Sequence, residues 1–339
     1  MANEAFVVFA PGVFKLTTLS LAPPSPGPGQ VLVRIRAVSL NYRDILIMEH
    51  SPAYPTATAT GLIPCSDAAG LVEAVGHDSQ REKGDRVVIM GNNWLNGTDS
   101  GWHAPSLDGT LRRWMVLDDG KIVKALEGLS FENVAPSFTA GCTAMNALYY
   151  GPVPLTSEMT VLTQGTGGVS CAAIQLAAAA GATAIATSSS NEKLQVAKRL
   201  GAKHVINYRE TPDWAAEALS LTGAKGVDHV VDVGGADTIE QSLKAVRTGG
   251  LASVVGILSE SHKADLIPAI LFGAKSTNAM TVRGILGAGS KEMLKAMIRI
   301  VEKHQLQPPV AKVFDFEQAR EAFAALKELS GVGKIVINC

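Results

Sequence analysis

The chain has no excess of charge of either sign: 30 lysines and arginines stand against 31 aspartates and glutamates among 339 residues. It also lacks a basic block or a basic stripe interleaved with aromatic residues, the pattern typical of nucleic-acid-binding surfaces. We therefore expect no nucleic-acid partner. Hydrophobic residues make up 47% of the chain, which is enough for large cores in one to three domains.

Cysteines are few, and no two of them have the spacing of a metal or redox motif. The four lie at Cys65, Cys142, Cys171 and Cys339. This scatter argues against a disulfide framework and favours a reducing compartment. Cys142 and Cys171 fall in apolar or helical segments, where buried, inert thiols are the expected state.

Long hydrophobic runs are also missing. The most apolar one, 172–186, is rich in alanine and is interrupted by Gln175 and Gly181, which favours a helix packed on a sheet over a membrane span. The N-terminus has no basic segment followed by an apolar one, so we expect no signal peptide. These absences predict a cytoplasmic protein without a membrane partner.

The first third of the chain predicts β-strands. Residues 31–37 alternate apolar and polar side chains, and the short apolar segments 70–75 and 86–90 lie between glycine-containing turns. A polar, glycine-rich stretch, 91–110, carries Trp94 and Trp102 and is interpreted as a lid, a binding loop or a decoration.

The pattern changes near Ser130, which can cap a short helical turn ending before Pro136, followed by a helix to about Tyr149. Strands and helices then alternate, which predicts a parallel, doubly wound sheet. The expected strands are 159–163, 183–187, 204–207, 227–233 and 250–256. The expected helices are 167–180, one from a Ser189-x-x-Glu192 capping box to Gly201, and 238–247 after Asp237-x-x-Glu240. A helix over 315–329 and a strand over 334–338 end the chain, and periodicity leaves their packing partner open.

The segment 161–170 combines an apolar strand, a glycine-rich turn and the start of a helix of small residues. Gly165, Gly167 and Gly168 form the turn, Val169 follows, and Ser170 stands where many such turns carry a third glycine. This arrangement brings backbone N–H groups and a helix N-terminus against a pyrophosphate. Tight turns also need glycine for steric reasons alone, but the strand–turn–helix context favours dinucleotide binding.

The second strand of this unit ends in hydroxyl groups instead of an acid. Ser188, Ser189 and Ser190 follow it, Lys193 is close by, and 184–190 contains no aspartate or glutamate. A carboxylate here would bind the ribose 2′-OH of NAD, whereas hydroxyls and a lysine suit the 2′-phosphate of NADP. One serine is expected to cap the following helix. Tyr208 is interpreted either as a contact to the adenosine or as a strand-end aromatic.

A metal site is not expected. The seven histidines show no i, i+4 pair and no cysteine two residues away, and a catalytic zinc needs three or four such ligands. The polar group that follows the strand 31–37, Asn41-Tyr42-Arg43-Asp44, has two interpretations. It forms a structural network, in which Arg43 and Asp44 simply pair, or Asn41 and Tyr42 donate hydrogen bonds to a substrate oxygen.

Several motifs together resemble the medium-chain dehydrogenase/reductase superfamily, and most closely its zinc-free branch of quinone oxidoreductases and enoyl or acrylyl-CoA reductases. The resemblance covers nearly the full length. The matching segments are 40–44, 67–76, 84–87, 140–144, the glycine turn, 200–208 and 333–336. It implies an α/β protein with a GroES-like, β-rich catalytic domain (1–130 and 280–339) and a Rossmann domain with a doubly wound parallel sheet (131–279).

The resemblance also implies roles for individual residues. Asn41 is expected near the nicotinamide, and Thr143 near the nicotinamide or its ribose. The pyrophosphate is assigned to the turn of Gly165, Gly167, Gly168 and Val169, the 2′-phosphate to Ser188, Ser189, Lys193 and Tyr208, and the nicotinamide ribose to Gly256, Ile257 and Leu258. The zinc-dependent relatives carry metal ligands where this chain has Asn41, Ser66 and Ala140, and their structural zinc lobe is replaced by 91–110.

These expectations favour an NADPH-dependent, zinc-independent reductase that transfers hydride to an activated C=C bond or a quinone, with Asn41 and Tyr42 as catalytic residues and a small electrophile as substrate. An NADP-dependent alcohol/carbonyl oxidoreductase and a non-catalytic NADPH-binding protein are the alternatives. The resemblance also implies a homodimer, because dimers are common in this family. The apolar stretch 266–272 is compatible with a dimer contact or with a core position.

Overall fold

The computed structural model describes residues 2–52, 60–90, 109–256, 258, 280–285, 287, 289–328 and 331–339. The chain forms two compact units, one of Met1–Thr139 with Gly289–Cys339 and one of Ala140–Ala288. Trp94, Trp102, Ile257 and the stretch 266–272, all of which the sequence singles out, lie outside the described residues.

The first unit is built on one long sheet in which the strands follow the order β14-β15-β3-β4-β5-β7, with β6 also paired to β3. The strands are β3 (Gln30–Ser39), β4 (Asp67–Val75), β5 (Arg86–Ile89), β6 (Trp114–Asp118), β7 (Ile122–Lys124), β14 (Val310–Asp315) and β15 (Lys334–Asn338). The predicted strand 334–338 is confirmed, and its antiparallel pairing with β3 supplies the partner that periodicity left open.

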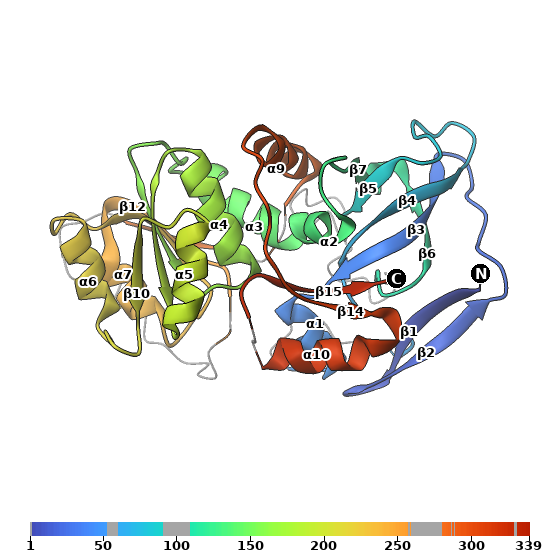
Figure 1. Ribbon diagram of the computed structural model, residues 1–339, viewed down its shortest axis with the longest axis horizontal. Coiled ribbons are helices and arrows are strands. Elements are labelled where there is room, and N and C mark those ends of the chain that lie inside the picture. Colours follow the sequence, from blue (N-terminus) through green and yellow to red (C-terminus); the bar gives the residue numbers. More distant parts are fainter. Residues whose placement is uncertain are drawn as a thin grey trace. The chain divides into compact units, whose positions relative to one another are not determined.

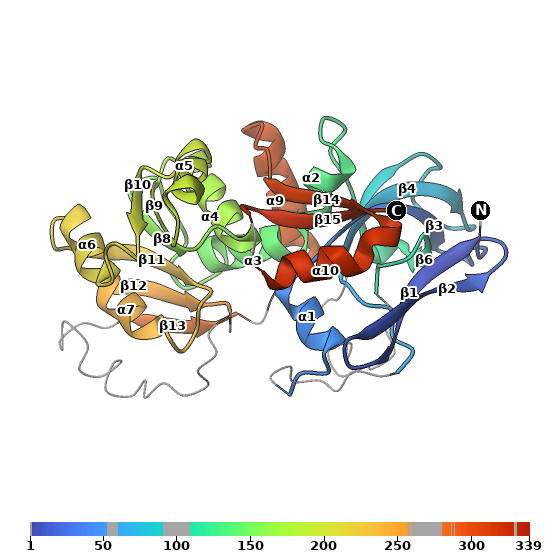
Figure 2. The same ribbon diagram turned by 60° about the horizontal axis from the view of Figure 1, so that its bottom comes forward.

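The hairpin of β1 (Asn3–Ala10) and β2 (Val13–Ser20) and several short helices complete this unit. The helices are α1 (Tyr42–Met48), α2 (Phe131–Val134), α9 (Lys291–Lys303) and α10 (Ala319–Lys327), with 3₁₀ turns at Asp119–Lys121, Ala135–Ser137 and Phe316–Gln318. Figure 2 shows α10 beside β14 and β15. The last predicted helix, 315–329, is thus a 3₁₀ turn followed by α10, because Asp315 and Gln318 form a capping box that begins the turn.

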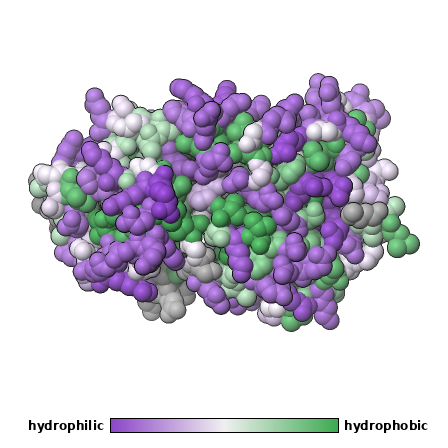
Figure 3. All heavy atoms as spheres, viewed as in Figure 1, coloured by the Kyte–Doolittle hydropathy of each residue, from purple (hydrophilic) through white to green (hydrophobic). Residues whose placement is uncertain are grey.

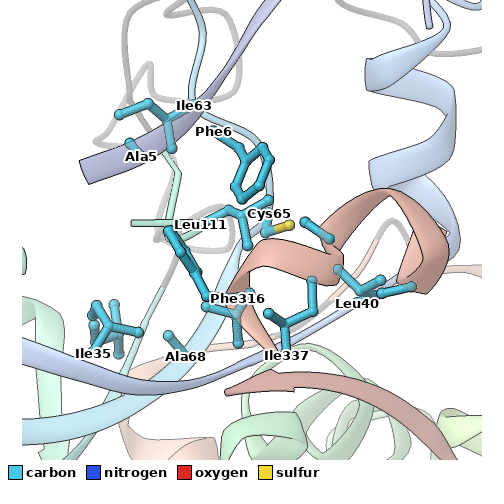
Figure 4. Close-up of a cluster of buried hydrophobic side chains, with 14 of the residues drawn as sticks. Ala5, Phe6, Ile35, Leu40, Ile63, Cys65, Ala68, Leu111, Phe316 and Ile337 are labelled. Carbon is cyan, nitrogen blue, oxygen red and sulfur yellow. The ribbon is translucent and has the colours of Figure 1, made fainter. Parts of the chain in front are cut away.

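The core of the first unit lies between the sheet, the hairpin and α10 (Figure 4). Phe6 from β1 meets Phe316 edge to face with the ring centroids 5.2 Å apart, and Leu111 and Ile337 belong to the same cluster. Buried aromatic pairs of this geometry add stabilisation beyond the area that they bury. The N-terminal hairpin and the C-terminal segments therefore share one core.

The second unit is built on a parallel six-stranded sheet with the order β10-β9-β8-β11-β12-β13 (Figure 2). Its strands are β8 (Thr160–Gln164), β9 (Thr183–Ser188), β10 (His204–Asn207), β11 (Val227–Asp232), β12 (Val246–Val254) and β13 (Thr281–Gly284). Its helices are α3 (Thr139–Tyr149, whose first residue belongs to the first unit), α4 (Gly168–Ala179), α5 (Asn191–Arg199), α6 (Trp214–Leu221) and α7 (Ile239–Ala245).

The predicted doubly wound parallel sheet is confirmed in this unit. Helices α6 and α7 pack on one face, where Trp214 and Leu243 join a cluster with Leu162 and Val230 of the strands. Helices α4 and α5 lie on the other face (Figure 1). The carboxyl ends of β8 and β9, where a doubly wound sheet binds its ligands, are therefore followed directly by α4 and α5.

Two predicted helix caps are wrong. Helix α5 is capped by Ser190, not Ser189, because β9 continues through Ser188 and the chain needs both following residues to turn. Helix α7 begins after Thr238 instead of Asp237, because the Asp232 carboxylate already closes this turn by accepting hydrogen bonds from Gly235 and Thr238. The predicted cap at Ser130 is confirmed by its bond from the Asn133 backbone N–H.

Hydrophilic side chains cover most of the face shown in Figure 3, with smaller groups of hydrophobic side chains between them. Among the residues that the structure describes, none of the helices combines the length and the apolar character that crossing a membrane requires.

Candidate functional site

The glycine turn joins the end of β8 to the start of α4. Gly165 has φ +69°, a conformation that side chains with a Cβ rarely adopt, and Gly167 is the N-cap of α4. A Cβ placed on Gly165 or on Gly167 would meet no atom within 4 Å, so both residues face open space. The first-turn N–H groups of α4 have no intrahelical partner. The turn of Gly165, Gly167, Gly168 and Val169 can therefore receive a pyrophosphate.

A buried hydrogen-bond network around Gln164 stabilises this turn. The Gln164 amide at the end of β8 donates to Asp232 Oδ2 (3.1 Å) and to Ser242 Oγ (2.7 Å), and its oxygen accepts from the Val233 and Gly234 backbone N–H groups (3.2 Å each). Ser170 Oγ donates to the Gln164 carbonyl at 2.6 Å. The serine at the third glycine position thus fastens α4 to β8 by a hydrogen bond.

Gly256 lies against the same loop. Its backbone N–H donates to the Asp232 carbonyl at 3.3 Å, and a Cβ on this residue would stand 2.1 Å from the Val233 carbonyl oxygen. Only glycine allows this close approach. Leu258 is partly exposed, and Ile257 lies outside the described residues. The structure therefore brings Gly256 to the loop that supports the glycine turn.

The end of β9 carries the residues assigned to a 2′-phosphate. Ser188 is buried at the last position of the strand, and the Tyr208 backbone N–H donates to its carbonyl at 3.1 Å. Ser190 caps α5 through the backbone N–H of Lys193, the third residue of that helix. Ser189 and Lys193 are half-buried, and Tyr208 is 41% exposed. The structure therefore gathers Ser188, Ser189, Lys193 and Tyr208 at one strand end, beside the N-terminus of α5.

Two carboxylates belong to this strand end as well, and both are engaged. Glu192 accepts a hydrogen bond from Ser190 Oγ. Glu210 accepts from Asn191 Nδ2 (2.7 Å) and from Asn207 Nδ2 (2.8 Å). Asn207 pairs with Ser188 across β9 and β10. Both acids lie beyond 184–190 in the sequence, so the prediction of the cofactor from that segment did not include them.

Thr143 is buried in α3 of the second unit. The helix is fastened to β13 by Arg283, whose guanidinium donates to the Asn146 carbonyl (2.9 Å) and to its side-chain oxygen (2.6 Å). The position of Thr143 therefore depends on the sheet of its own unit.

The first unit contains a separate cluster of polar side chains, hereafter the polar cluster: the buried Asn41, Asp67 and Lys334 and the partly buried Thr139. Asn41 Nδ2 donates to Asp67 Oδ2 at 3.0 Å, and Lys334 Nζ donates to Asn41 Oδ1 at 2.5 Å. The backbone N–H and the hydroxyl of Thr139 donate to Asp67 Oδ1 at 3.0 and 2.6 Å. Sheet register explains the gathering, because Ser39 of β3 pairs with Asp67 of β4 and with Val336 of β15.

Burial dominates the electrostatics of the polar cluster. It raises the pKa of Asp67 and lowers the pKa of Lys334, while the attraction between these two charges opposes both shifts. Burial also raises the pKa of Asp44 to about 6, although the Arg43 guanidinium and the backbone N–H of Asn41 favour its charged form. Burial thus favours the neutral forms of Asp67, Asp44 and Lys334, and the attraction between the Lys334 ammonium and the two carboxylates favours the charged forms.

Tyr42 and Arg43 follow the polar cluster at the start of α1. Arg43 Nη1 lies 3.3 Å from Asp44 Oδ1, so the simple pairing that the sequence allowed is present. Tyr42 is half-buried, and its hydroxyl makes no hydrogen bond to the part of the chain that the structure describes. The amide of Asn41, in contrast, bonds to Asp67 and Lys334.

The positions at which zinc-dependent relatives carry metal ligands hold few donor atoms in this chain. Within the described ranges, no group of three or more His, Cys, Asp or Glu side chains is placed to hold a metal. Of the three positions where zinc-dependent relatives carry ligands, Ala140 has no donor atom, Ser66 offers a hydroxyl, and Asn41 presents its oxygen to the Lys334 ammonium. A cation at that oxygen repels a divalent metal.

The sequence indicated Asn41 but not its partners Asp67 and Lys334, nor Thr139, which donates to Asp67. It also did not indicate the network of Gln164, Asp232 and Ser242. The only signals were weak. Asp67 and Lys334 lie in the matching segments 67–76 and 333–336, where no role was assigned to them, and Asp232 is the last residue but one of the predicted strand 227–233. Nothing in the local pattern joins residues so far apart along the chain.

Family profiles match both units. The alcohol dehydrogenase GroES-like domain matches residues 27–127, and the zinc-binding dehydrogenase profile matches 168–303. A zinc-type alcohol dehydrogenase-like protein of Schizosaccharomyces pombe is 39% identical over 93% of this chain and 92% of its own. A 2-haloacrylate reductase of a Burkholderia species is 30% identical over 92% of each chain.

Two solved structures share the fold over nearly the whole length. An NAD-dependent alcohol dehydrogenase is 32% identical with a TM-score of 0.84 and 99% of each chain covered. A quinone oxidoreductase of Pseudomonas syringae is 26% identical with a TM-score of 0.79 and 100% of each chain covered. The chain belongs to the medium-chain dehydrogenase/reductase superfamily, in its quinone oxidoreductase-like branch, and it is an oxidoreductase of that superfamily.

Proposed function

We propose that the protein is an NADPH-dependent, zinc-independent reductase of small molecules with an activated C=C bond or a quinone ring. Two arrangements support this proposal. The first is the open glycine turn, which is followed by a strand end with Ser188, Ser190, Tyr208 and Lys193. The second is the polar cluster, in which Lys334 contacts Asn41. The names of the haloacrylate and quinone relatives support the substrate class.

The residues at the end of β9 favour the phosphorylated dinucleotide. A 2′-phosphate carries up to two negative charges, which the Lys193 ammonium and the N-terminus of α5 attract. Ser188 takes the place where a carboxylate would accept from a ribose hydroxyl, and the carboxylates of Glu192 and Glu210 are already hydrogen-bonded.

The bound nicotinamide would supply the hydride, and the acceptor is a carbon made electrophilic by a conjugated oxygen. Negative charge then grows on that oxygen. Without a metal, hydrogen-bond donors have to stabilise it, and removing one well-placed donor costs roughly 2.7–4 kcal/mol. Tyr42, whose hydroxyl is free of partners among the described residues, would return the proton.

A substrate panel tests the proposal. The purified protein is given NADPH or NADH with an enone, a quinone, a 2-haloacrylate or a simple aldehyde, and loss of reduced cofactor is followed with and without a chelator. We expect kcat/KM with NADPH to exceed that with NADH at least about tenfold, a difference of roughly 1.4 kcal/mol. Oxidation confined to the aldehyde arm, equal use of both cofactors, or loss of activity with the chelator would overturn it.

A further inference from the structure

The side-chain amide of Asn41 is held between two groups of opposite hydrogen-bonding character. Lys334 Nζ can only donate, and it faces Asn41 Oδ1 at 2.5 Å. An ionised Asp67 can only accept, and its Oδ2 lies 3.0 Å from Asn41 Nδ2. Because an ammonium has no lone pair and a carboxylate has no proton, the amide has one allowed orientation.

The backbone at the start of β15 places Lys334 beside Asn41. Lys334 opens β15, its backbone N–H donates to the Pro309 carbonyl at 3.0 Å, and the residue is only 8% exposed. The preceding residue, Gly333, has φ +93°, and a Cβ there would lie 2.1 Å from the same Pro309 oxygen. A lysine in a buried position loses hydration that costs several kcal/mol unless it gains partners. Within the described residues its hydrogen bond goes to Asn41 alone.

One N–H of Asn41 remains weakly used. Among the residues that the structure describes, Nδ2 reaches only the Ser39 carbonyl besides Asp67, at 3.4 Å, which is longer than a well-formed hydrogen bond. A cation at the amide oxygen polarises the amide and strengthens its N–H as a donor. The orientation set by Lys334 thus leaves one activated N–H that a substrate oxygen can take over from Ser39.

We propose that Lys334 is a positioning residue of the reductase site: its ammonium fixes and polarises the Asn41 amide, so that Asn41 presents one N–H to the oxygen on which charge develops. This inference rests on the function proposed above. It assigns to a buried side chain the electrostatic task that zinc-dependent relatives give to a metal, and it makes the ammonium of Lys334 part of the catalytic electrostatics.

The primary test compares Lys334→Met and Lys334→Arg with Lys327→Met, a matched control on an exposed lysine of α10 that pairs with Glu49. Lys334→Met is expected to lower kcat about 100-fold and to leave the dissociation constant of NADPH within about twofold, because only the orientation of a catalytic donor is lost. Lys334→Arg, which keeps the charge, is expected to restore most of kcat. A folded Lys334→Met with kcat within about threefold of the unchanged protein would overturn the inference.

The double variant Lys334→Met/Asp67→Asn tests whether Lys334 positions Asn41 or only balances the charge of Asp67. Because it removes one charge of each sign, it also provides a folded variant for the test if Lys334→Met alone does not fold. Positioning predicts a folded double variant with kcat still low. Recovery of kcat to the level of the unchanged protein would show that Lys334 only neutralises Asp67, and this would overturn the inference.

A stability cycle keeps the test independent of turnover. If the unchanged protein oxidises no NADPH with any acceptor, the proposed function fails, and the contact itself is then read from the thermal midpoints of Lys334→Met, Asn41→Leu and the double variant. A double variant that loses less than the sum of the two single losses supports the coupling of these residues. A double variant whose loss equals the sum of the two single losses would show that Lys334 and Asn41 are not coupled.

Discussion

Gln164 and Asp232 stand at the ends of two adjacent parallel strands, β8 and β11, and their side chains are joined by a hydrogen bond of 3.1 Å across 68 residues of sequence. The bond ties the start of the glycine turn to the loop that contains Val233 and Gly234. The turn is therefore shaped by a buried contact outside its own sequence.

Gln164→Leu should loosen this arrangement. The variant leaves two backbone N–H groups without their acceptor, which we expect to cost about 1–3 kcal/mol of unfolding free energy. The dissociation constant of NADPH should rise about tenfold, equivalent to roughly 1.4 kcal/mol. Urea denaturation and fluorescence titration measure the two effects, with the exposed Gln195→Leu of α5 as the control. Unchanged affinity in the destabilised variant would show that the network does not shape the turn.

Lys193→Ala should discriminate between the two cofactors. Loss of a charge-assisted contact is expected to weaken NADPH binding by about 1.5–3 kcal/mol, while NADH, which has no 2′-phosphate, should bind as before. Isothermal titration with both cofactors checks this, and Lys198→Ala in the last turn of α5 is the control. An equal loss for NADPH and NADH would place the lysine outside the phosphate site.

Tyr42→Phe should affect turnover without affecting the fold. The hydroxyl makes no hydrogen bond within the described part of the chain, so we expect a change in unfolding free energy within about 0.5 kcal/mol. If Tyr42 returns the proton, kcat should fall roughly 100-fold. Steady-state kinetics on an accepted substrate measure this. Undiminished turnover would remove Tyr42 from the mechanism.

His229 should make the stability of the second unit depend on pH. Burial in β11 lowers its pKa from an ordinary 6.5 to about 4, against the opposing attraction of Asp228. The unfolded chain binds a proton near pH 6.5 and the folded chain does not. Stability is therefore complete above pH 6.5 and decreases as the pH falls toward 4, by up to about 3 kcal/mol in total.

Urea denaturation of the unchanged protein and of His229→Leu between pH 7.5 and 4.5 tests this dependence. The free energy of unfolding of His229→Leu should decrease less over this range, because its side chain does not titrate. Parallel pH curves for the two proteins would show that another group is responsible.

Gly333→Ala should destabilise the first unit. The added methyl group would stand 2.1 Å from the Pro309 oxygen in a backbone conformation with φ +93°, and we expect a loss of at least about 2 kcal/mol. Gly128→Ala, where a Cβ meets nothing within 4 Å, is the matched control and should change stability by less than about 0.5 kcal/mol. Thermal and chemical denaturation measure both. Similar losses in the two variants would contradict the steric argument.

The regular elements could be predicted from the sequence where local chemistry decides them. The strand His204–Asn207 and the strand Lys334–Asn338 have the predicted bounds, and α4 begins one residue after the predicted start. Caps were less predictable: Ser189 and Asp237 carry suitable side chains, but the continuation of β9 and the prior engagement of Asp232 selected Ser190 and Thr238.

The sequence by itself determined the order of the elements and the glycine turn with the serine-rich segment 184–190 that follows it. It also determined that Asn41, Ser66 and Ala140 stand at the positions of the zinc ligands of relatives. Residue type and spacing along one segment express these features. The tertiary structure decided which polar groups meet. Lys334 reaches Asn41 across 293 residues only because β15 pairs with β3 in one register. A register shift of one residue would turn the side chain of Lys334 to the opposite face of the sheet.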